Sequence, residues 1–413
     1  MTADRDITLK YGTVDCRFSV PASVTVDEFS ASRVERPITF DQFKADFDKS
    51  NGRSFLESDR LLFVVNDAYR HTPTELVLGW LEQLAPGVVA RAHYIIATGS
   101  HEPPTDAQLK KIFGAHLPAI RTRVSWHEAT DGGSMHGIGR DAFGQQVFVN
   151  RAVLEHKSIV VIGSVEPHYF AGYTGGRKSI FPGLIDLATI ERNHNLANSL
   201  EARPLRLQGN PVNTHLQSLM KLVDLSKIFS VQLVADSSGS IGSVFFGPLE
   251  NSFTSAVEYA RPLYARQVRE KYDVALCEIL PPLDKNLYQA QKGLENCEAG
   301  VADGGAIIVV SPCDEGIGST FFYELASHWD REKNEPHDGV LHFGSHKLAR
   351  VNLMTRRIDV RVHSTLPADK VRKVFYEPAA DLAGFVNDKI RANNHLRLAV
   401  VHDAGHTVLT TSQ

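Results

Sequence analysis

The sequence predicts an α/β fold of two domains, each built around a mostly parallel sheet. Seven short apolar runs, rich in β-branched residues and followed by small or turn-forming residues, are typical of strands buried on both faces. They are residues 61–67, 94–98, 158–163, 229–235, 273–279, 306–311 and 396–402. Helical patterns lie between them, and this alternation indicates parallel sheets. A chain of 413 residues exceeds one ordinary core, so two domains are expected.

Helices are predicted at residues 73–81, 105–113 and 251–270. Thr72 is the expected N-cap of the first helix, with Pro73 at its first position. The third helix ends where a new strand begins, which indicates a domain boundary. We therefore expect an N-terminal catalytic and cofactor-binding domain of residues 1–270, to which residues 395–413 return, and a C-terminal α/β domain of residues 271–394.

The composition excludes several classes of partner. Hydrophobic residues make up 43% of the chain and charged residues 22%, as in soluble globular proteins. The net charge of −4 and the lack of a Lys/Arg stripe argue against nucleic acid. We expect no membrane partner, because no stretch of about 18 apolar residues occurs and the N-terminus lacks an apolar signal core. Four widely spaced cysteines, with no C-x-x-C pair, favour a reduced, cytoplasmic protein.

Chemically suited side chains follow the first two runs, and ligands of parallel sheets bind at the carboxyl ends of strands. Arg70, just beyond Asp67, could bind a carboxylate or phosphate through two parallel hydrogen bonds. A small-residue turn presents His101, which suits acid–base work near neutral pH. Each has an ordinary alternative, a surface arginine beside a helix cap and a capping histidine.

The densest block of candidate residues follows the third run. It contains His168, the glycines Gly175 and Gly176, and the adjacent cations Arg177 and Lys178. Glycines let the backbone approach a ligand closely, and exposed amides can bind an anion. The two cations add charge for a phosphate, and Lys178 could also be a nucleophilic amine. The block is not a Walker loop, because Arg177 stands in the place of the second glycine. An ordinary flexible loop rarely combines these residue types, so function is favoured.

Two further sets extend the candidate site. His194, on a predicted helix, could join His101 and His168 in a metal site, although the spacing matches no zinc pattern. In the C-terminal domain, Gln289 and Lys292 share one face of a helix. They are either a solvent-facing pair or groups that reach into the interdomain cleft, where we expect the active site.

Together and in this order, the blocks resemble the nickel-pincer lactate racemase family. The most specific part is H-Y-F-A-G-Y-T-G-G-R-K-S-I-F-P-G, which begins at His168. D-x-x-R at residues 67–70, A-T-G-x-H at 97–101, N-H at 193–194 and Y-Q-A-x-K-G at 288–293 complete the pattern. The resemblance spans nearly the whole chain. It implies an isomerase that racemises or epimerises 2-hydroxy acids with nickel held by a pyridinium mononucleotide carrying two sulfur-bearing arms.

The resemblance assigns one group of residues to the cofactor. Lys178 resembles the residue that tethers the mononucleotide covalently through a thioamide, and His194 the protein ligand that completes square-planar nickel. Asp67 resembles a partner that orients its neighbours. Gly175, Gly176 and Arg177 are also expected to bind the cofactor, because the glycines allow it to lie close and Arg177 adds charge for a phosphate.

A second group is assigned to the substrate. His101 and His168 resemble two acid–base residues, one on each face of the substrate. Arg70 and Lys292 resemble the groups that hold the substrate carboxylate, and Gln289 and Tyr288 assist. Ser100 departs from the pattern, because lactate-specific members place a bulky aromatic residue there. We therefore expect a substrate longer or more polar than lactate, such as malate or a sugar acid.

The implied chemistry is reversible transfer of hydride from C2 to the cofactor through a planar 2-keto acid, which avoids a carbanion. The resemblance also implies cofactor biosynthesis proteins as partners, and a homo-oligomer is possible. Two other functions stay open at this point. One is a metal-dependent hydrolase with His101, His168 and His194 around zinc. The other is a non-catalytic protein that binds an anionic metabolite through the same cations.

Overall fold

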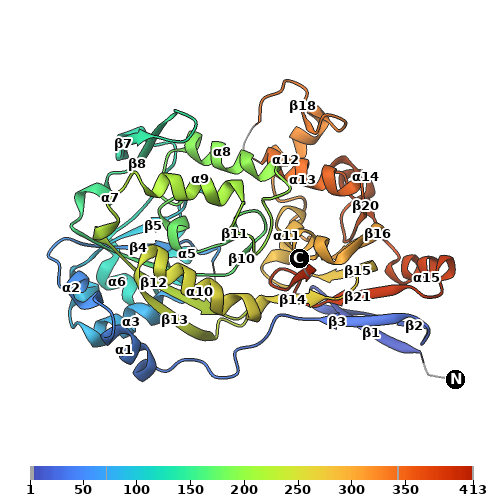
Figure 1. Ribbon diagram of the computed structural model, residues 1–413, viewed down its shortest axis with the longest axis horizontal. Helices are drawn as coiled ribbons and strands as arrows, with labels where there is room; N and C mark the ends of the chain where they lie inside the picture. The colour runs from blue at the N-terminus through green and yellow to red at the C-terminus, as the bar shows by residue number, and fades with distance from the viewer. Residues whose placement is uncertain (1–3, 71, 342–343, 412–413) are drawn as a thin grey trace. The chain divides into compact units, whose positions relative to one another are not determined.

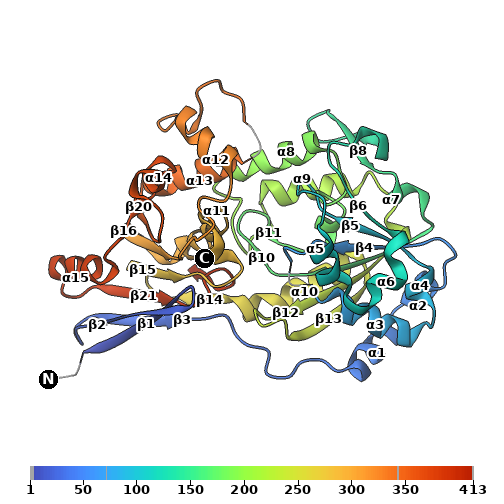
Figure 2. The same ribbon diagram turned by 180° about the vertical axis from the view of Figure 1, so that it is seen from behind.

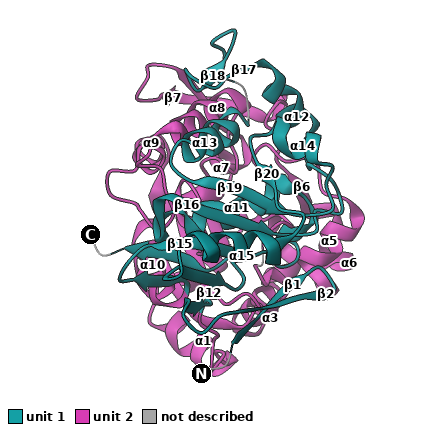
Figure 3. Ribbon diagram, turned by 90° about the vertical axis from the view of Figure 1, so that its right-hand side faces the viewer, with its two compact units in different colours: residues 1–31, 264–413 teal, residues 32–263 magenta. Residues whose placement is uncertain are grey.

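The computed structural model describes residues 4–70, 72–341 and 344–411, and the chain forms two compact units. Unit 2 is residues 32–263, whereas unit 1 combines residues 1–31 with residues 264–413 (Figure 3). Each unit contains a six-stranded, mainly parallel sheet. The predicted two-domain α/β class is therefore confirmed. Within the described ranges, no helix has both the length and the apolar character needed to span a bilayer.

The sheet of unit 2 has the strand order β13-β12-β9-β4-β5-β6. Its strands are β4 (Leu61–Asn66), β5 (His93–Ala97), β6 (Val124–Trp126), β9 (Ser158–Ser164), β12 (Ile228–Ala235) and β13 (Ile241–Pro248). Neighbours run parallel except β12 and β13. The four predicted runs of this region correspond to β4, β5, β9 and β12. All seven residues of β9 are buried, as expected for a strand covered on both faces.

Helices and two small hairpins complete unit 2. The helices are α1 (Phe40–Asp48), α2 (Gly52–Leu56), α3 (Thr74–Leu84), α4 (Val88–Arg91), α5 (Asp106–Phe113), α6 (Leu117–Ile120), α7 (Ala152–Glu155), α8 (Leu187–Asn195), α9 (Pro211–Met220) and α10 (Leu249–Tyr264). The hairpins are β7 (Met135–Arg140) with β8 (Gln146–Asn150), and β10 (Pro167–His168) with β11 (Gly172–Tyr173). Helices α8 and α9 lie side by side in both views (Figures 1 and 2).

The start of α3 differs from the prediction by one residue. The helix begins at Thr74, and its N-cap is Pro73, not Thr72. The Thr72 hydroxyl instead accepts a hydrogen bond from Asn66 Nδ2 at 2.8 Å and lies 2.8 Å from Ser164 Oγ. It thereby joins the carboxyl ends of β4 and β9, which explains why it does not cap the helix.

The sheet of unit 1 is wholly parallel and has the order β20-β19-β16-β15-β21-β3. Its strands are β3 (Thr25–Phe29), β15 (Tyr272–Glu278), β16 (Val301–Val310), β19 (Asp359–His363), β20 (Glu377–Pro378) and β21 (Arg397–Val401). Alternate residues of β16 enter two cores, Ile307 and Val309 on one face and Ile308 and Val310 on the other.

The remaining elements of unit 1 flank this sheet. Its helices are α11 (Leu287–Cys297), α12 (Thr320–Leu325), α13 (Ser345–Thr355), α14 (Ala368–Lys373) and α15 (Leu382–Ala392). The paired strands are β1 (Arg5–Tyr11) with β2 (Val14–Val20), β14 (Ala265–Val268) with β22 (Val408–Thr411), and β17 (Trp329–Asp330) with β18 (Glu335–Pro336).

The predicted domain boundaries were wrong at both ends of the chain. Residues 1–31 belong to unit 1, because β3 pairs with β21 at the edge of its sheet, where blue and red strands lie together in Figure 1. Residues 395–413 also stay in unit 1, because β21 pairs with β15 and β22 with β14. The internal boundary falls at residues 263–264, since α10 ends at Tyr264 and β14 follows directly.

His402 joins three neighbouring strand ends in unit 1. His402, just after β21, lies 2.6 Å from Glu278 Oε2 through Nδ1 and 3.3 Å from Glu28 Oε2 through Nε2. Glu28 also pairs with Arg5 at 2.9 Å. The hydrogen bond to Glu278 raises the pKa of His402 above its ordinary value of 6.5, against the opposing effect of burial, and Glu28 adds to the rise. Protonated His402 therefore ties the edge strand β3 to the sheet.

This arrangement predicts a stability that falls as the pH rises. Because the folded pKa is raised, the stabilisation is fully present below pH 6.5 and is lost as the pH passes through the folded pKa. Each unit of pKa shift corresponds to about 1.4 kcal/mol in the free energy of unfolding. Urea titrations between pH 6 and 9 should reveal this loss in the parent protein and a flatter profile in His402→Gln. Equal slopes in the two proteins would contradict the role of His402.

Candidate functional site

The predicted site residues of unit 2 follow three adjacent strands. Asp67 and Arg70 come after β4, Ser100 and His101 after β5, and His168 shortly after β9. These strands are neighbours and run parallel, in the order β9-β4-β5. Their carboxyl ends therefore meet at one edge of the sheet, as the sequence predicts.

His101 and Asp67 form the shortest contact of the set. His101 Nδ1 lies 2.5 Å from Asp67 Oδ2, the carboxylate is buried, and the imidazole is 48% exposed. An ionised carboxylate only accepts hydrogen bonds, so Nδ1 carries the proton and Nε2 keeps its lone pair. The ring of Tyr69 packs edge-on against His101, with 5.0 Å between ring centroids. The pair is thus arranged as an oriented base at the strand ends.

Arg70 is held by a carboxylate that the sequence did not single out. Its Nη1 lies 3.3 Å from Glu166 Oε1, and both side chains are mostly buried. Glu166 follows β9, so this ion pair connects the loops after β4 and β9. It orients the guanidinium, whose remaining N–H groups suit a carboxylate ligand.

Phe170 is the residue around which three predicted site residues gather. Its buried ring lies 4.5 Å from the ring of His168 and 5.2 Å from the ring of His194, both measured between centroids. Lys178 Nζ lies 5.8 Å from the centre of the same ring. The structure therefore brings together His168 from β10, Lys178 from the turn Gly176–Ser179 and His194 from α8.

The surroundings of Lys178 and His194 shift both pKa values toward the uncharged forms of the side chains. Burial, with the positive charges of Arg70 and Arg177, lowers the pKa of Lys178 to about 7. Burial also lowers the pKa of His194 to about 3, and the charges of Lys178 and His101 add to this effect. A neutral amine is nucleophilic and a neutral imidazole can bind a metal.

His168 differs from His101 in the hydrogen bond that its Nδ1 makes. That atom accepts a long hydrogen bond from the backbone N–H of Ala171, at 3.3 Å. The proton of the neutral ring is therefore on Nε2, whereas in His101 it is on Nδ1. The ring also stacks on Tyr169, with centroids 5.1 Å apart.

Three predicted cofactor-binding residues have partners inside the protein itself. A Cβ on Gly175 would lie 2.6 Å from Val165 Cγ2, and one on Gly176 would lie 2.6 Å from the Phe253 ring. The Gly176 amide donates to Gln232 Oε1 at 2.7 Å. Internal packing thus accounts for these glycines, which adopt φ values of 75° and 54°.

Arg177 is likewise engaged within unit 2. Its buried guanidinium lies 3.2 Å from Glu250 Oε2, hydrogen-bonds to Asn213 Oδ1 and covers the Phe253 ring at 4.7 Å. A role for Arg177 in cofactor binding stays a prediction.

The predicted residues of unit 1 lie on α11. Asn286 caps this helix by accepting from the Gln289 amide at 3.0 Å, which fixes its first turn. Lys347 Nζ donates to the carbonyl of Tyr288 at 2.5 Å and lies 4.1 Å from the centre of its ring. Burial and the positive charge of Lys292 lower the pKa of Lys347 well below its ordinary value. Lys347 therefore contacts Tyr288 and lies within electrostatic range of Lys292.

Sequence reasoning missed Tyr69, Glu166, Phe170 and Lys347. Glu166 and Phe170 each lie two residues from His168 in the sequence. This closeness to a predicted site residue was the signal that could have identified them. Lys347 comes from α13, far along the chain, and no local pattern marks it. In the part of the chain that the structure describes, no group of three or more His, Cys, Asp or Glu side chains is arranged to hold a metal by itself.

Comparisons with known sequences identify relatives of this chain. Family models for the lactate racemase N-terminal and C-terminal domains match residues 18–203 and 277–355. A lactate racemase of Thermoanaerobacterium thermosaccharolyticum is 29% identical over 362 residues, which cover 83% of each chain. A lactate racemase of Lactiplantibacillus plantarum is 31% identical over 266 residues, covering 64% of this chain and 61% of that protein.

Two solved structures share the fold. The lactate racemase apoprotein of T. thermosaccharolyticum superposes with a TM-score of 0.86 and 23% identity, covering 98% of this chain and 100% of that one. A crystal structure of a Thermotoga maritima protein gives a TM-score of 0.70 at 17% identity, covering 91% and 99%. The sequence matches confirm the predicted enzyme class, a racemase and hence an isomerase, and the chain belongs to the lactate racemase family.

Proposed function

We propose that this protein racemises or epimerises a 2-hydroxy acid at C2, using a nickel-pincer nucleotide attached to Lys178. One observation carries the proposal. His168, Lys178 and His194, which the family pattern assigns as proton carrier, tether and nickel ligand, surround the single ring of Phe170. Residues with three complementary tasks in one reaction would need this proximity.

The donor chemistry of the residues fits the cofactor. With a pKa of about 7, a large fraction of Lys178 is a neutral amine at neutral pH, as covalent attachment requires. His194 stays neutral over the same range and offers a lone pair to a metal. When bound, the cofactor supplies an acceptor that takes a hydride from C2 of the substrate and returns it. The protein then has to provide only one metal ligand.

His101 is proposed to move the hydroxyl proton on one face of the substrate. Its Nδ1–H is held by Asp67, so Nε2 is free of that contact and can accept the proton as hydride leaves C2. The negative Asp67 then stabilises the imidazolium. The oxidised substrate is a planar 2-keto acid, which can receive hydride on either face.

His168 is proposed to serve the opposite face. To act as an acid it must carry protons on both nitrogens, so its Nδ1 must leave the Ala171 amide. The 3.3 Å length of that hydrogen bond makes this exchange inexpensive. We therefore expect the His168 ring to rotate away from the Ala171 amide when the substrate binds.

Arg70 and Lys292 are proposed to hold the substrate carboxylate. The Glu166 pair keeps the Arg70 guanidinium in place before substrate arrives, which reduces the conformational entropy lost on binding. Ser100 is small and polar, so we expect room next to His101 for a substituent larger than the methyl group of lactate. We therefore propose a longer or more polar substrate, with malate and sugar acids as the first candidates.

The test is to express the chain together with the proteins that make the cofactor. We expect an intact-mass adduct on Lys178, bound nickel, and loss of optical activity from at least one enantiopure 2-hydroxy acid. The panel should contain lactate, malate and a sugar acid, each in both configurations where available. Chiral chromatography identifies the substrate and separates racemisation from epimerisation.

Each alternative function gives a different result in the same experiment. A hydrolase would bind zinc, carry no adduct on Lys178 and leave every 2-hydroxy acid optically unchanged. A non-catalytic binding protein would bind the acid with unchanged affinity in His101→Ala and turn nothing over. Either pattern would refute the proposal.

A further inference from the structure

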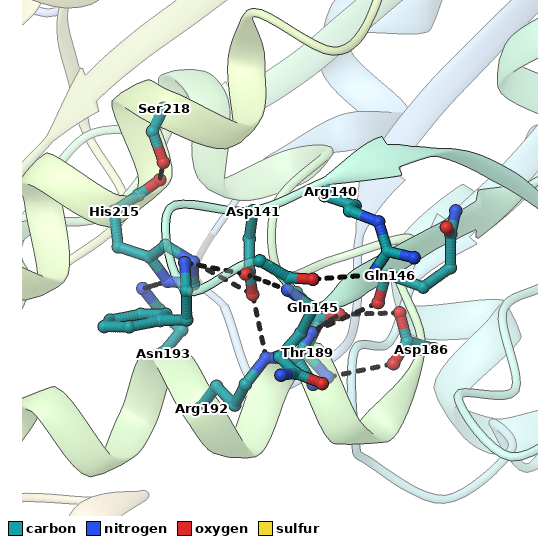
Figure 4. A network of polar contacts seen from close by, with 12 residues as sticks. Arg140, Asp141, Gln145, Gln146, Asp186, Thr189, Arg192, Asn193, His215 and Ser218 are labelled. Carbon is teal, nitrogen blue, oxygen red and sulfur yellow. Dashed lines mark hydrogen bonds and ion pairs between the residues drawn. The ribbon is translucent and has the colours of Figure 1, made fainter.

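A buried aspartate outside the catalytic residues connects a hairpin to the helix that carries His194. Asp141 lies in the turn between β7 and β8, and its side chain is 0% exposed. Oδ1 accepts from the amides of Phe143 and Gln145, both at 2.9 Å. Oδ2 accepts from Arg192 Nε at 2.8 Å and lies 3.7 Å from His215 Nε2 (Figure 4). One carboxylate thus contacts the turn, α8 and α9.

Arg192 makes further hydrogen bonds to α8 and to the β7–β8 hairpin. Its Nη2 donates to Thr189 Oγ1 at 2.7 Å and to the carbonyl of Gln146 at 3.3 Å. Asp186, the N-cap of α8, accepts from the Phe148 amide of β8 at 3.0 Å. The β7–β8 hairpin therefore holds both the start and the last turn of the helix.

Asn193 anchors the other side of the same turn. Its Nδ2 donates to the carbonyl of Val212 at 3.1 Å and to His215 Nδ1 at 3.2 Å. An amide N–H₂ can only donate, so the proton of neutral His215 is on Nε2, the nitrogen that faces Asp141. The contacts form a closed loop through Asp141, Arg192, Asn193 and His215 (Figure 4), and His194 is the next residue along the helix.

A second turn in the same unit provides an internal comparison. Asp236, between β12 and β13, accepts through Oδ1 from the amides of Ser238 at 2.9 Å and Ser240 at 3.1 Å. The two turns share the pattern D-x-x-G-x and the same backbone hydrogen bonds. Oδ2 of Asp236 accepts from the backbone amide of Val34 at 2.8 Å. The turn itself thus occupies one carboxylate oxygen, and the second oxygen is available to fix another segment.

Short helices depend on tertiary contacts, because isolated helices of this length are unstable in water. Helix α8 has nine residues, and its last turn bears the proposed metal ligand. Partners that orient a ligand residue commonly change metal affinity by about 10- to 100-fold when they are removed. Such a role accounts for a fully buried carboxylate at this place.

We propose that Asp141, with Arg192, Asn193 and His215, is a positioning device that fixes the last turn of α8 and through it the ring of His194. Asp141 is a positioning residue, since it is proposed to act through Arg192 and α8. The inference rests on the proposed function for the role of His194, but the fixing of α8 is a property of the protein alone.

The test compares Asp141→Asn with Asp236→Asn. In both variants asparagine keeps one oxygen for the turn amides and loses the second acceptor. Hydrogen exchange of the cofactor-free proteins should be about 10-fold faster in residues 187–195 for Asp141→Asn only, because only this variant releases α8. Equal exchange of that segment in the two variants would overturn the proposal, whatever metal the protein binds.

In protein loaded with cofactor, Asp141→Asn should keep the Lys178 adduct mass but release nickel to a chelator about 10- to 100-fold faster than the parent. Asp236→Asn should release nickel at the parental rate, even where its melting temperature falls equally. Arg192→Lys should restore slow release relative to Arg192→Met, because lysine keeps a cationic donor for Asp141. A parent protein without nickel would refute the proposed function, while the exchange result would still decide the role of the network.

Discussion

A Lys178→Ala protein, expressed with the cofactor-making proteins, is expected to carry no covalent adduct and to racemise its substrate at least about 10⁴-fold more slowly than the parent. Losses of this size follow when a group that the chemistry cannot bypass is removed. The amine of Lys178 is the proposed attachment point, and its pKa of about 7 leaves much of it neutral and nucleophilic at neutral pH. Intact mass and chiral chromatography measure the two effects.

The matched variant is Lys178→Arg, which keeps the positive charge but lacks an amine that deprotonates near neutral pH. It should fail as completely as the alanine variant. Lys157→Ala, at an exposed lysine of the same unit, should keep both the adduct and the activity. A normal adduct mass in Lys178→Ala would show that the cofactor is attached elsewhere or not covalently.

The second large effect concerns the proton path at His101. His101→Ala should lower racemisation by about 10²- to 10⁴-fold, the usual contribution of a positioned acid–base group. The Lys178 adduct and bound nickel should stay unchanged, because His101 is proposed to contact the substrate and not to hold the cofactor. Rates with each enantiomer, together with metal content and intact mass, separate these outcomes.

Asp67→Asn tests the tautomer of His101 without removing the ring. An asparagine amide can donate to Nδ1, which moves the imidazole proton to Nε2 and removes the basic lone pair there. Activity should fall by up to about 10⁴-fold, as when the aspartate of a catalytic triad is replaced by asparagine. His402→Gln, a substitution in unit 1 at a residue with no proposed catalytic or binding role, should keep full activity. Normal turnover by Asp67→Asn would refute the proposed orientation of His101.

The parallel core of the protein was predictable because its strands are continuous apolar runs. Strands β4 and β9 and the second half of β16 are buried on both faces, so their sequences differ plainly from their surroundings. The carboxyl ends of β4, β5 and β9 then indicated where Arg70, His101 and His168 would lie, and the structure places all three at the same sheet edge.

The N-terminal strands escaped prediction for the opposite reason. Strand β3 reads TVDEF and lies at the edge of its sheet, and most residues of β1 and β2 are exposed or only partly buried. Such edge strands carry charged residues and form no apolar run. Their assignment to unit 1 depends on pairing with β21, more than 350 residues away along the chain, which no local pattern encodes.

Tertiary packing also determines the role of individual residues in the densest block of candidate residues, which follows β9. Gly175, Gly176 and Arg177 looked like ligand-binding residues because of their types and spacing. Their observed neighbours, Gln232 and Phe253, come from β12 and α10. Lys178, in the same block, contacts Phe170. The sequence could identify the block as a whole. Only the fold shows that Gly175, Gly176 and Arg177 pack against β12 and α10, whereas Lys178 lies beside Phe170.

Unit 1 consists of two chain segments on either side of unit 2, and this fixes the order in which the two units can fold during synthesis. Residues 32–263 are contiguous, so unit 2 has all its strands once they have left the ribosome. Strand β3 precedes unit 2 along the chain, but its partner β21 is made only after unit 2. Until then the N-terminal segment has an unpaired edge, and closing the sheet requires a contact of very large sequence separation. Lys178 and His194 can therefore reach their folded surroundings while unit 1, with Lys292, is still being made.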